Sequence, residues 1–354
     1  MTQPEKVRRR RRLDWRLLLV LPVLAVAVSL IWFRGPDWNA VRDAFSAVRW
    51  EWVVIAILLN LASVVVRALA WNTAIRQAMP PPYPRFRSIF AAFCVGLFGN
   101  VVLPGRVGEL ARVAVLRRRV PGRPGATPTL IGSVFAHRVF DLFPALALIV
   151  WVLFAAKLPH WALTSLIVVA CVGFGFFAFA LATARRQHTH IDGMGTVRTL
   201  LARLRVGLAI MRAPLPALVA ISFQTMGWVL QLMAVAATMH AFHIYVPIAA
   251  AGLVLVLMNV ATIFPLWPGN IGLVQAAIAL PLVQYGVPYA KGFAFGIGLQ
   301  AIEASVGIGV GLVFLAREGF SYAMLKDMPE AAEVFPAVVE AAGEPRAERS
   351  RVPG

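Results

Sequence analysis

Charged residues are scarce in this sequence, since Asp, Glu, Lys and Arg make up 14% of its 354 residues, whereas soluble domains carry roughly a quarter. Hydrophobic residues make up 60%, and the mean hydropathy is +0.75. This composition excludes the soluble class and indicates an integral membrane protein. Repeated apolar runs of about 20 residues, the length that crosses ~30 Å of hydrocarbon, predict one all-α bundle rather than two soluble domains.

Cysteine is nearly absent. Cys94 and Cys171 both lie in apolar segments without spaced Cys or His companions, so we expect packing residues and no metal site. The sequence also lacks a glycine-lysine phosphate loop of the Walker type, so ATP cannot drive the protein directly. We expect no cofactor.

Acidic residues are half as common as basic ones, and the formal net charge is +18. In a soluble protein this excess would suggest nucleic acid. Here the arginines form short clusters between apolar runs, as in cytoplasmic loops of membrane proteins. We therefore expect contact with anionic lipid and no nucleic-acid partner.

The two ends of the chain differ from its middle. Residues 1–16 predict a basic cytoplasmic tail, and 17–317 a transmembrane domain. The apolar run Leu17–Phe33 is too long for a signal peptide and has no small-residue cleavage site after it, so we expect an uncleaved first span. Residues 318–354 have little large apolar content from Pro329 onward, which predicts a disordered cytoplasmic tail.

About six full transmembrane helices are expected, at roughly 17–33, 53–71, 129–155, 161–183, 215–240 and 289–315. Gly35–Glu51 is rich in Trp and charge, as in an amphipathic element at the outer interface. Two further segments, about 88–118 and 247–284, are apolar but interrupted by proline and glycine. A single crossing by Ser88–Leu103 would put the following arginines outside, against the charge rule, so we expect a re-entrant hairpin.

The two interruptions align. Pro104-Gly105-Arg106-Val107-Gly108 corresponds to Pro268-Gly269-Asn270-Ile271-Gly272, and the topology brings the two hairpins in from opposite sides as an inverted repeat. Broken helices in corresponding halves indicate a transporter's binding site. Whether the hairpins are re-entrant or fully spanning stays open at this point.

A helix that starts after Pro-Gly offers free N–H groups, which attract phosphate. Arg106 and Arg112, with Glu109 between them, would strengthen this attraction, although these arginines could instead extend to the cytoplasmic interface. Arg138 and Asp141 are one helical turn apart and can pair. That pair is either functional or a lock between helices.

Further polar residues within the expected spans indicate a polar interior, although each alone is more typical of an interhelical hydrogen bond. They are Asn60, Arg67, Asn100, Gln224, Asn259, Gln275, Gln300 and Glu303.

These motifs resemble the lysylphosphatidylglycerol synthase transmembrane (flippase-like) family. The resemblance spans roughly residues 15–317 and rests on Asn100 with Leu103 to Glu109 and Arg112, Arg67 with Trp71, Arg138 with Asp141, and Pro268 to Gly272. The family implies a multi-pass bacterial or archaeal plasma-membrane protein that moves a polar-headed or polyprenyl-linked lipid between leaflets. The soluble aminoacyl-transferase domain of some relatives is not expected here. Family members often have Glu at the positions of His137 and Gln275, which makes an aminoacylated lipid a poorer fit than an anionic or glycosylated one.

We therefore expect a lipid flippase in a bacterial inner membrane, not an enzyme, with both termini cytoplasmic and its oligomeric state open. The alternatives are a non-transporting partner subunit of an envelope-lipid enzyme, or a membrane lipid transferase that uses Glu109, His137 and Asp141. No catalytic residue is expected. The candidate substrate-binding residues are Asn100, Pro104, Gly105, Arg106, Gly108, Glu109, Arg112, Arg138, Asp141, Pro268, Gly269, Asn270, Gly272 and Gln275.

Overall fold

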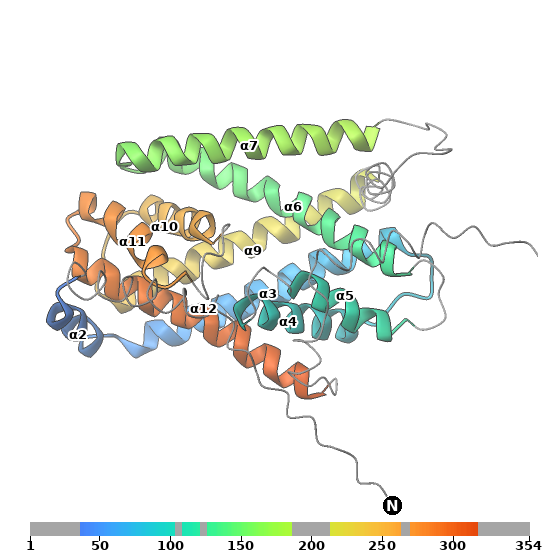
Figure 1. Ribbon diagram of the computed structural model, residues 1–354, viewed down its shortest axis with the longest axis horizontal. Helices are drawn as coiled ribbons and strands as arrows, with labels where there is room; N and C mark the ends of the chain where they lie inside the picture. The colour runs from blue at the N-terminus through green and yellow to red at the C-terminus, as the bar shows by residue number, and fades with distance from the viewer. Residues whose placement is uncertain (1–35, 103–107, 121–125, 186–212, 263–269, 318–354) are drawn as a thin grey trace, which may run out of the picture.

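The computed structural model describes residues 36–102, 108–120, 126–185, 213–262 and 270–317. These residues form helices, with no strand among them, as expected for an all-α membrane protein. The helices run largely along one long axis of the molecule (Figure 1).

The helices follow one another as α2 (Trp38–Ser46), α3 (Trp50–Ala78), α4 (Phe86–Val102), α5 (Gly108–Arg118), α6 (Ala126–Ala155), α7 (His160–Arg185), α9 (Pro214–Ala241), α10 (Ile248–Ala261), α11 (Leu273–Leu282), the 3-10 turn η4 (Val283–Tyr285) and α12 (Tyr289–Arg317). Within the described ranges, α3, α6, α9 and α12 are long and apolar enough to cross a membrane.

Most of the expected spans are present as helices. The expected spans at 53–71, 129–155, 215–240 and 289–315 fall in α3, α6, α9 and α12, and the span at 161–183 falls in α7. The span at 17–33, the basic tail 1–16 and the tail 318–354 lie outside the described residues. The expected amphipathic segment contains α2, which Asp37 caps by accepting hydrogen bonds from the amides of Asn39 and Ala40 at 2.9 and 3.4 Å.

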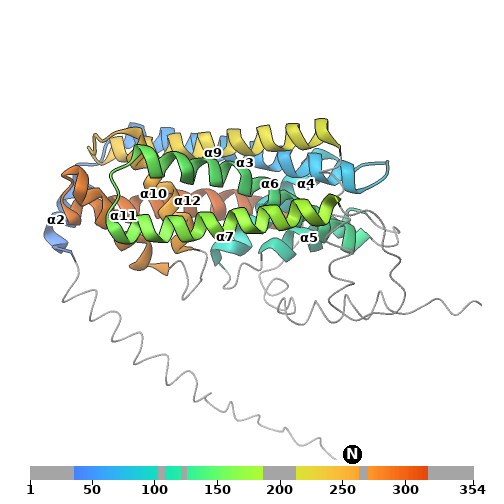
Figure 2. The same cartoon turned by 90° about the horizontal axis from the view of Figure 1, so that it is seen from above.

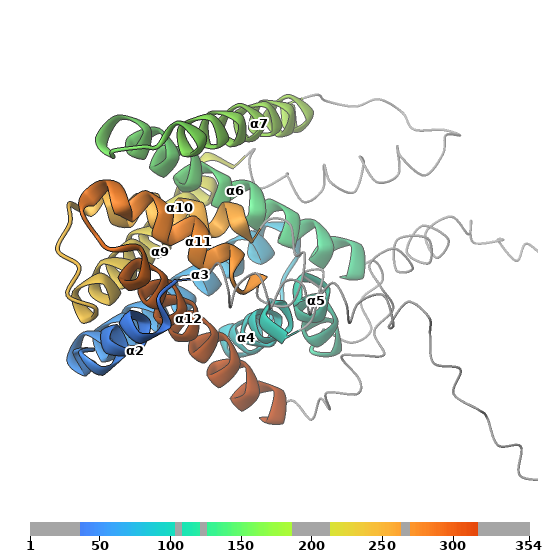
Figure 3. The same cartoon turned by 60° about the vertical axis from the view of Figure 1, so that its left-hand side comes forward.

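The scaffold is the pair of long helices α3 and α9, which lie side by side along the long axis (Figure 2). Ser63 Oγ on α3 donates to the carbonyl of Gly227 on α9 at 3.0 Å. A Cβ at Gly227 would come to 2.8 Å from Cγ of Arg67, so this glycine leaves the room that the Arg67 side chain occupies. At the edge of the bundle, α7 packs along α6 (Figure 3).

The two predicted hairpins correspond to α4–α5, the first hairpin, and α10–α11, the second hairpin. They lie at opposite ends of the long axis, the second near α2 and the first at the far end (Figures 1 and 2). In the first hairpin α4 and α5 touch backbone to backbone, because a Cβ at Gly99 would come to 2.9 Å from Cα of Gly108. The tips, 103–107 and 263–269, lie outside the described residues.

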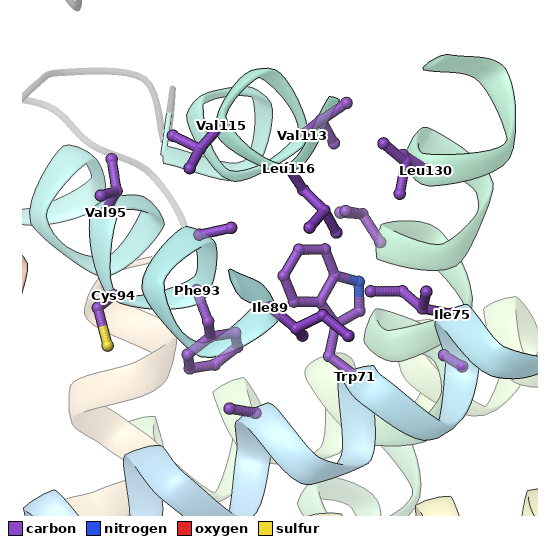
Figure 4. Packing of buried hydrophobic residues seen from close by; sticks show 14 of the residues in the cluster. Trp71, Ile75, Ile89, Phe93, Cys94, Val95, Val113, Val115, Leu116 and Leu130 are labelled. Atoms are coloured by element: carbon purple, nitrogen blue, oxygen red, sulfur yellow. The ribbon is translucent and has the colours of Figure 1, made fainter. Parts of the chain in front are cut away.

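Each hairpin has its own hydrophobic core. The first core joins α3, α4, α5 and α6, with Trp71, Leu116 and Leu130 fully buried together (Figure 4). The second joins α9, α10, α11 and α12 around Leu255 and Phe295. Arg67, Arg138 and Gln231 lie near the middle of the long helices α3, α6 and α9.

Candidate functional site

Glu109, in the first turn of α5, joins the first hairpin to α6. Its Oε2 accepts a hydrogen bond from Nη2 of Arg112, one turn further along α5. Its Oε1 accepts one from Nη2 of Arg138 on α6. One carboxylate therefore holds two guanidinium groups that belong to different helices, which is the strong, charge-assisted form of hydrogen bonding.

Arg112 is enclosed by aromatic rings. The residue is 3% exposed, and its guanidinium carbon lies 4.9 Å from the ring centre of Trp71 and 5.7 Å from that of Phe93. Aromatic faces attract cations, most strongly where water is excluded. This position contradicts the alternative in which Arg112 extends to the cytoplasmic interface.

Asp141 forms a second centre of charge pairing. Its Oδ2 lies 3.4 Å from Nη1 of Arg138, so the predicted pairing of these two residues is confirmed. Its Oδ1 accepts a hydrogen bond from Nε1 of Trp228 on α9 at 2.7 Å and lies 3.9 Å from Nη1 of Arg67 on α3. Asp141 therefore connects α6 to both scaffold helices.

Arg67 extends the connections to α12. Its Nη2 donates to Oε1 of Gln231 at 2.8 Å, and Nε2 of Gln231 donates to Oε1 of Glu303 at 3.2 Å. Its guanidinium also lies over the Trp228 ring, 5.4 Å from the ring centre. Arg67, Glu109, Arg112, Arg138 and Asp141 are called the ion-pair network below.

A cavity of about 110 Å³ adjoins the ion-pair network. This volume suits a small polar group rather than a whole lipid. The cavity is lined by Asn60, Ser63, Val64, Arg67, Phe93, Gly96, Leu97, Asn100, Gly108, Glu109, Arg112, His137, Arg138 and Gln231.

Several polar atoms of the cavity wall are buried without a partner in the part of the chain that the structure describes. They are Nε of Arg67, Nε of Arg112, Oδ1 of Asn100 and Nδ1 of His137. Buried polar atoms ordinarily have hydrogen-bond partners, and each exception needs an explanation. Two of the four are N–H donors of guanidinium groups whose residues line the cavity, and guanidinium groups are the side chains that bind oxyanions best.

The charges of the ion-pair network do not cancel. It contains three guanidinium groups and two carboxylates, which leaves one positive charge in excess. Asp141 and Arg138 lie near the middle of α6, and Arg67 lies well inside α3, at depths where a charge in a membrane is costly. A bound anion would offset this excess charge.

The polar residues of the second hairpin form hydrogen bonds within the hairpin and to α12. Oε1 of Gln275 accepts from the amide of Gly272 at 2.6 Å, where φ is +93°, and Nε2 of Gln275 donates to Oε1 of Gln300 at 2.5 Å. Nδ2 of Asn270 donates to the carbonyl of Ala261 at 2.7 Å. Asn270, Gly272 and Gln275 are not among the residues that line the cavity. Their expected part in substrate binding stays a prediction.

The described residues contain no group of three or more His, Cys, Asp or Glu side chains placed to hold a metal ion. His137, the nearest histidine to the ion-pair network in sequence, is 3% exposed and has its ring edge-on to Phe93 at 5.9 Å between ring centres.

A comparison with protein families finds one match of nearly full length. The family described as "Lysylphosphatidylglycerol synthase TM region" matches residues 16–311. The chain belongs to this family. Searches of curated proteins and of solved structures returned no match.

The lysylphosphatidylglycerol synthase family match agrees with the resemblance seen in the sequence, and it includes every predicted site residue. The structure brings Asn100, Gly108, Glu109, Arg112 and Arg138 to the cavity wall and Asp141 to the ion-pair network. The tip residues Pro104, Gly105, Arg106, Pro268 and Gly269 lie outside the described residues.

The cavity is also lined by polar residues that were not among the predicted substrate-binding residues. They are Asn60, Ser63 and Arg67 of α3, His137 of α6 and Gln231 of α9. A signal for the α3 residues was present in their spacing, because positions 60, 63, 67 and 71 share one face of a helix. On α9 the residues Gln224, Trp228 and Gln231 follow the same spacing.

Proposed function

We propose that this protein moves an anionic lipid between the leaflets of a bacterial plasma membrane, and that the lipid's headgroup passes through the cavity beside the ion-pair network. The observation that carries the proposal is the excess of guanidinium over carboxylate groups around a cavity near the middle of the long helices. A phosphate is the charged group that lipids present most often, and arginine binds phosphate through paired N–H donors.

The size of the cavity supports movement of the headgroup alone. A space of about 110 Å³ takes a phosphate with a few further atoms, so the acyl or polyprenyl chains would stay in the surrounding bilayer. The guanidinium groups of Arg67, Arg112 and Arg138, which line the cavity, would donate to the phosphate oxygens. On this proposal the protein is a transporter and its partner is a membrane lipid.

The orientation follows from the distribution of arginine. The end of α3, the start of α4 and the end of α5 lie at the same side of the molecule (Figure 1). This side carries five arginines, which are Arg76, Arg85, Arg87, Arg117 and Arg118. Positively charged loops stay in the cytoplasm. We propose that this end, from which the first hairpin extends, faces the cytoplasm and that α2, at the opposite end, faces outward.

The test is reconstitution of the full chain into liposomes with fluorescent phospholipid and polyprenyl-phosphate probes. We expect the wild type to exchange an anionic probe between leaflets faster than empty liposomes. Arg138→Gln and Arg67→Gln should slow this exchange by about tenfold or more, because each removes a charge-assisted hydrogen bond.

Arg49→Gln is the matched control. Arg49 is an arginine of the same fold whose side chain is 44% exposed, and it pairs with Glu51 away from the cavity. Exchange that is unaffected by the Arg67 and Arg138 substitutions, or that never exceeds the empty-liposome rate with folded protein, would refute the proposal. The second outcome would favour a partner subunit.

A further inference from the structure

Glu303 is the carboxyl group near the cavity that the ion-pair network does not include. It lies near the middle of α12 and is partly buried. Glu109 and Asp141 each lie within 4 Å of two guanidinium groups. Glu303 has none within that distance in the described ranges, and its Oε1 accepts a hydrogen bond from the neutral amide of Gln231.

This difference determines the charge that each carboxyl group can hold. An ionised carboxylate in a membrane interior is very costly unless a cation pairs with it, and a carboxyl group without such a partner takes up a proton instead. Glu109 and Asp141 have their cations, so both are stable as anions. Glu303 has a neutral amide, so its stable form in the present arrangement is the protonated one.

Gln231 links this carboxyl group to Arg67. The Gln231 amide accepts from Arg67 through Oε1 and donates to Glu303 through Nε2. Arg67 is only loosely held by Asp141, because their closest approach of 3.9 Å is long for a hydrogen bond. Arg67 is therefore the cation that these hydrogen bonds connect to Glu303. A negative charge on Glu303 would attract its guanidinium group.

We infer that Glu303 is a proton-binding site coupled through Gln231 and Arg67 to the anion site in the cavity, so that a proton and an anionic headgroup bind together. The inference rests on the proposed function. When Glu303 is protonated, Arg67 faces the cavity and can hold the anion. When Glu303 loses the proton, its carboxylate attracts Arg67 and competes with the headgroup.

The surroundings of Glu303 supply no other charge that could take this part among the described residues. Gln231 of α9 contacts Glu303 directly, and Arg67 of α3 contacts Gln231. Asp141 of α6 lies 3.9 Å from Arg67. The other charged residues of α12 itself, Lys291 and Arg317, lie near its ends, α11 has none, and α4 has Arg87 in its first turn. α2, which has Arg42 and Asp43, packs near the start of α12, where Trp38 contacts Phe293. The other charged residues of α3, Glu51 and Arg76, lie in its first and last turns.

The coupling has a definite sign. Lowering the pH favours protonated Glu303 and thereby strengthens anion binding, and by reciprocity anion binding drives proton uptake. If one proton is coupled, the dissociation constant of the anion rises by up to about tenfold for each unit by which the pH exceeds the pKa of Glu303.

The experiment uses the purified full chain in detergent and titrates dioctanoyl phosphatidylglycerol across a pH series, with zwitterionic dioctanoyl phosphatidylcholine as the reference. Calorimetry in buffers of different ionisation enthalpy measures the protons taken up on binding. We expect proton uptake with the anionic lipid in the wild type. Glu303→Gln should abolish that uptake and bind with the wild type's low-pH affinity at every pH.

Gln231→Leu provides a second variant, which keeps Glu303 but removes its connection to Arg67, and should also bind without pH dependence. Glu51→Gln, at an exposed carboxyl group, is the control that should behave as wild type. If Glu303→Gln does not fold, Gln231→Leu carries the same test. Lipid binding with no proton uptake, or with unchanged pH dependence in the folded variants, overturns the coupling alone. Absence of anionic-lipid binding at every pH overturns the proposed function as well.

Discussion

In the first hairpin the helix after the break begins Gly108-Glu109, and the carboxylate of Glu109 binds guanidinium groups of α5 and α6. In the second hairpin the corresponding helix follows Gly272, and the nearby polar residue is Gln275, an amide that binds the Gly272 backbone and Gln300. The two hairpins share a plan but differ in where their polar groups point. The first hairpin's groups line a cavity, while the second's bond the hairpin's own backbone and attach it to α12.

This contrast indicates a division of work between the repeats. The first hairpin supplies charge to the site at the cost of burying Arg112, and it needs Trp71 and Phe93 to surround that cation. The second hairpin contains no charged residue within its described helices. A sequence repeat therefore does not imply two equal half-sites. The following substitutions test the contrast, beginning with the largest expected effect.

Glu109→Gln should be the most damaging change in the first hairpin. It leaves Arg112 and Arg138 without their shared carboxylate, and uncompensated charge of this kind destabilises by about 3 kcal/mol or more. The free energy of unfolding in mixed micelles, followed by tryptophan fluorescence, measures the loss. Glu51→Gln, at an exposed ion pair, should leave the unfolding curve unchanged. Equal curves for both variants would mean that the Glu109 pairs contribute nothing to stability.

Gly108→Ala should separate α4 from α5. The added methyl group would overlap the carbonyl oxygen of Gly96 and lie 2.6 Å from Oδ1 of Asn100, so the helices must move apart. Overpacking of this kind costs about 1 to 3 kcal/mol. Gly309→Ala is the control, because the space around Gly309 is open. The melting temperature in detergent should fall for the first and not for the second, and the same fall in both would contradict the close packing.

Gln275→Leu tests the neutral hairpin. The change removes the acceptor of the Gly272 amide and the donor to Gln300, and buried groups without partners cost about 1 to 3 kcal/mol. Stability should fall while the liposome exchange rate of the remaining folded protein stays near that of wild type, because Gln275 does not line the cavity. A selective loss of exchange would show instead that the second hairpin contributes to the substrate site.

Gln275→Glu should have the smallest effect. A protonated carboxyl group has the shape of the amide, and it can accept from Gly272 with its carbonyl and donate to Gln300 with its hydroxyl. We expect a change in unfolding free energy below about 1 kcal/mol, since volume is conserved. The same unfolding measurement checks it, and a loss as large as that of Gln275→Leu would contradict the assigned hydrogen bonds.

The sequence predicted the elements better than their contacts. Apolar length predicted the long helices, and the proline-glycine pairs predicted that α4 and α5, and α10 and α11, are separate helices, because those signals are local. The re-entrant character of the two hairpins stays a prediction. The one-turn spacing of Arg138 and Asp141 predicted their pairing for the same reason. The bridge from Glu109 to Arg138 was not predicted, because it depends on how α5 lies against α6. Gln231 was missed because a single amide in a long apolar helix has no local signature, and only tertiary packing reveals that it joins Arg67 to Glu303.

The close packing of α12 has a mechanical consequence. Gly307 and Gly311 bring its backbone against α4 of the first hairpin, and Gly292 and Gly296 bring it against α11 of the second. Because these glycines leave no spare room at either contact, a shift of α12 along its axis would displace both hairpins together. The same continuous helix thus ties the packing of one hairpin to that of the other.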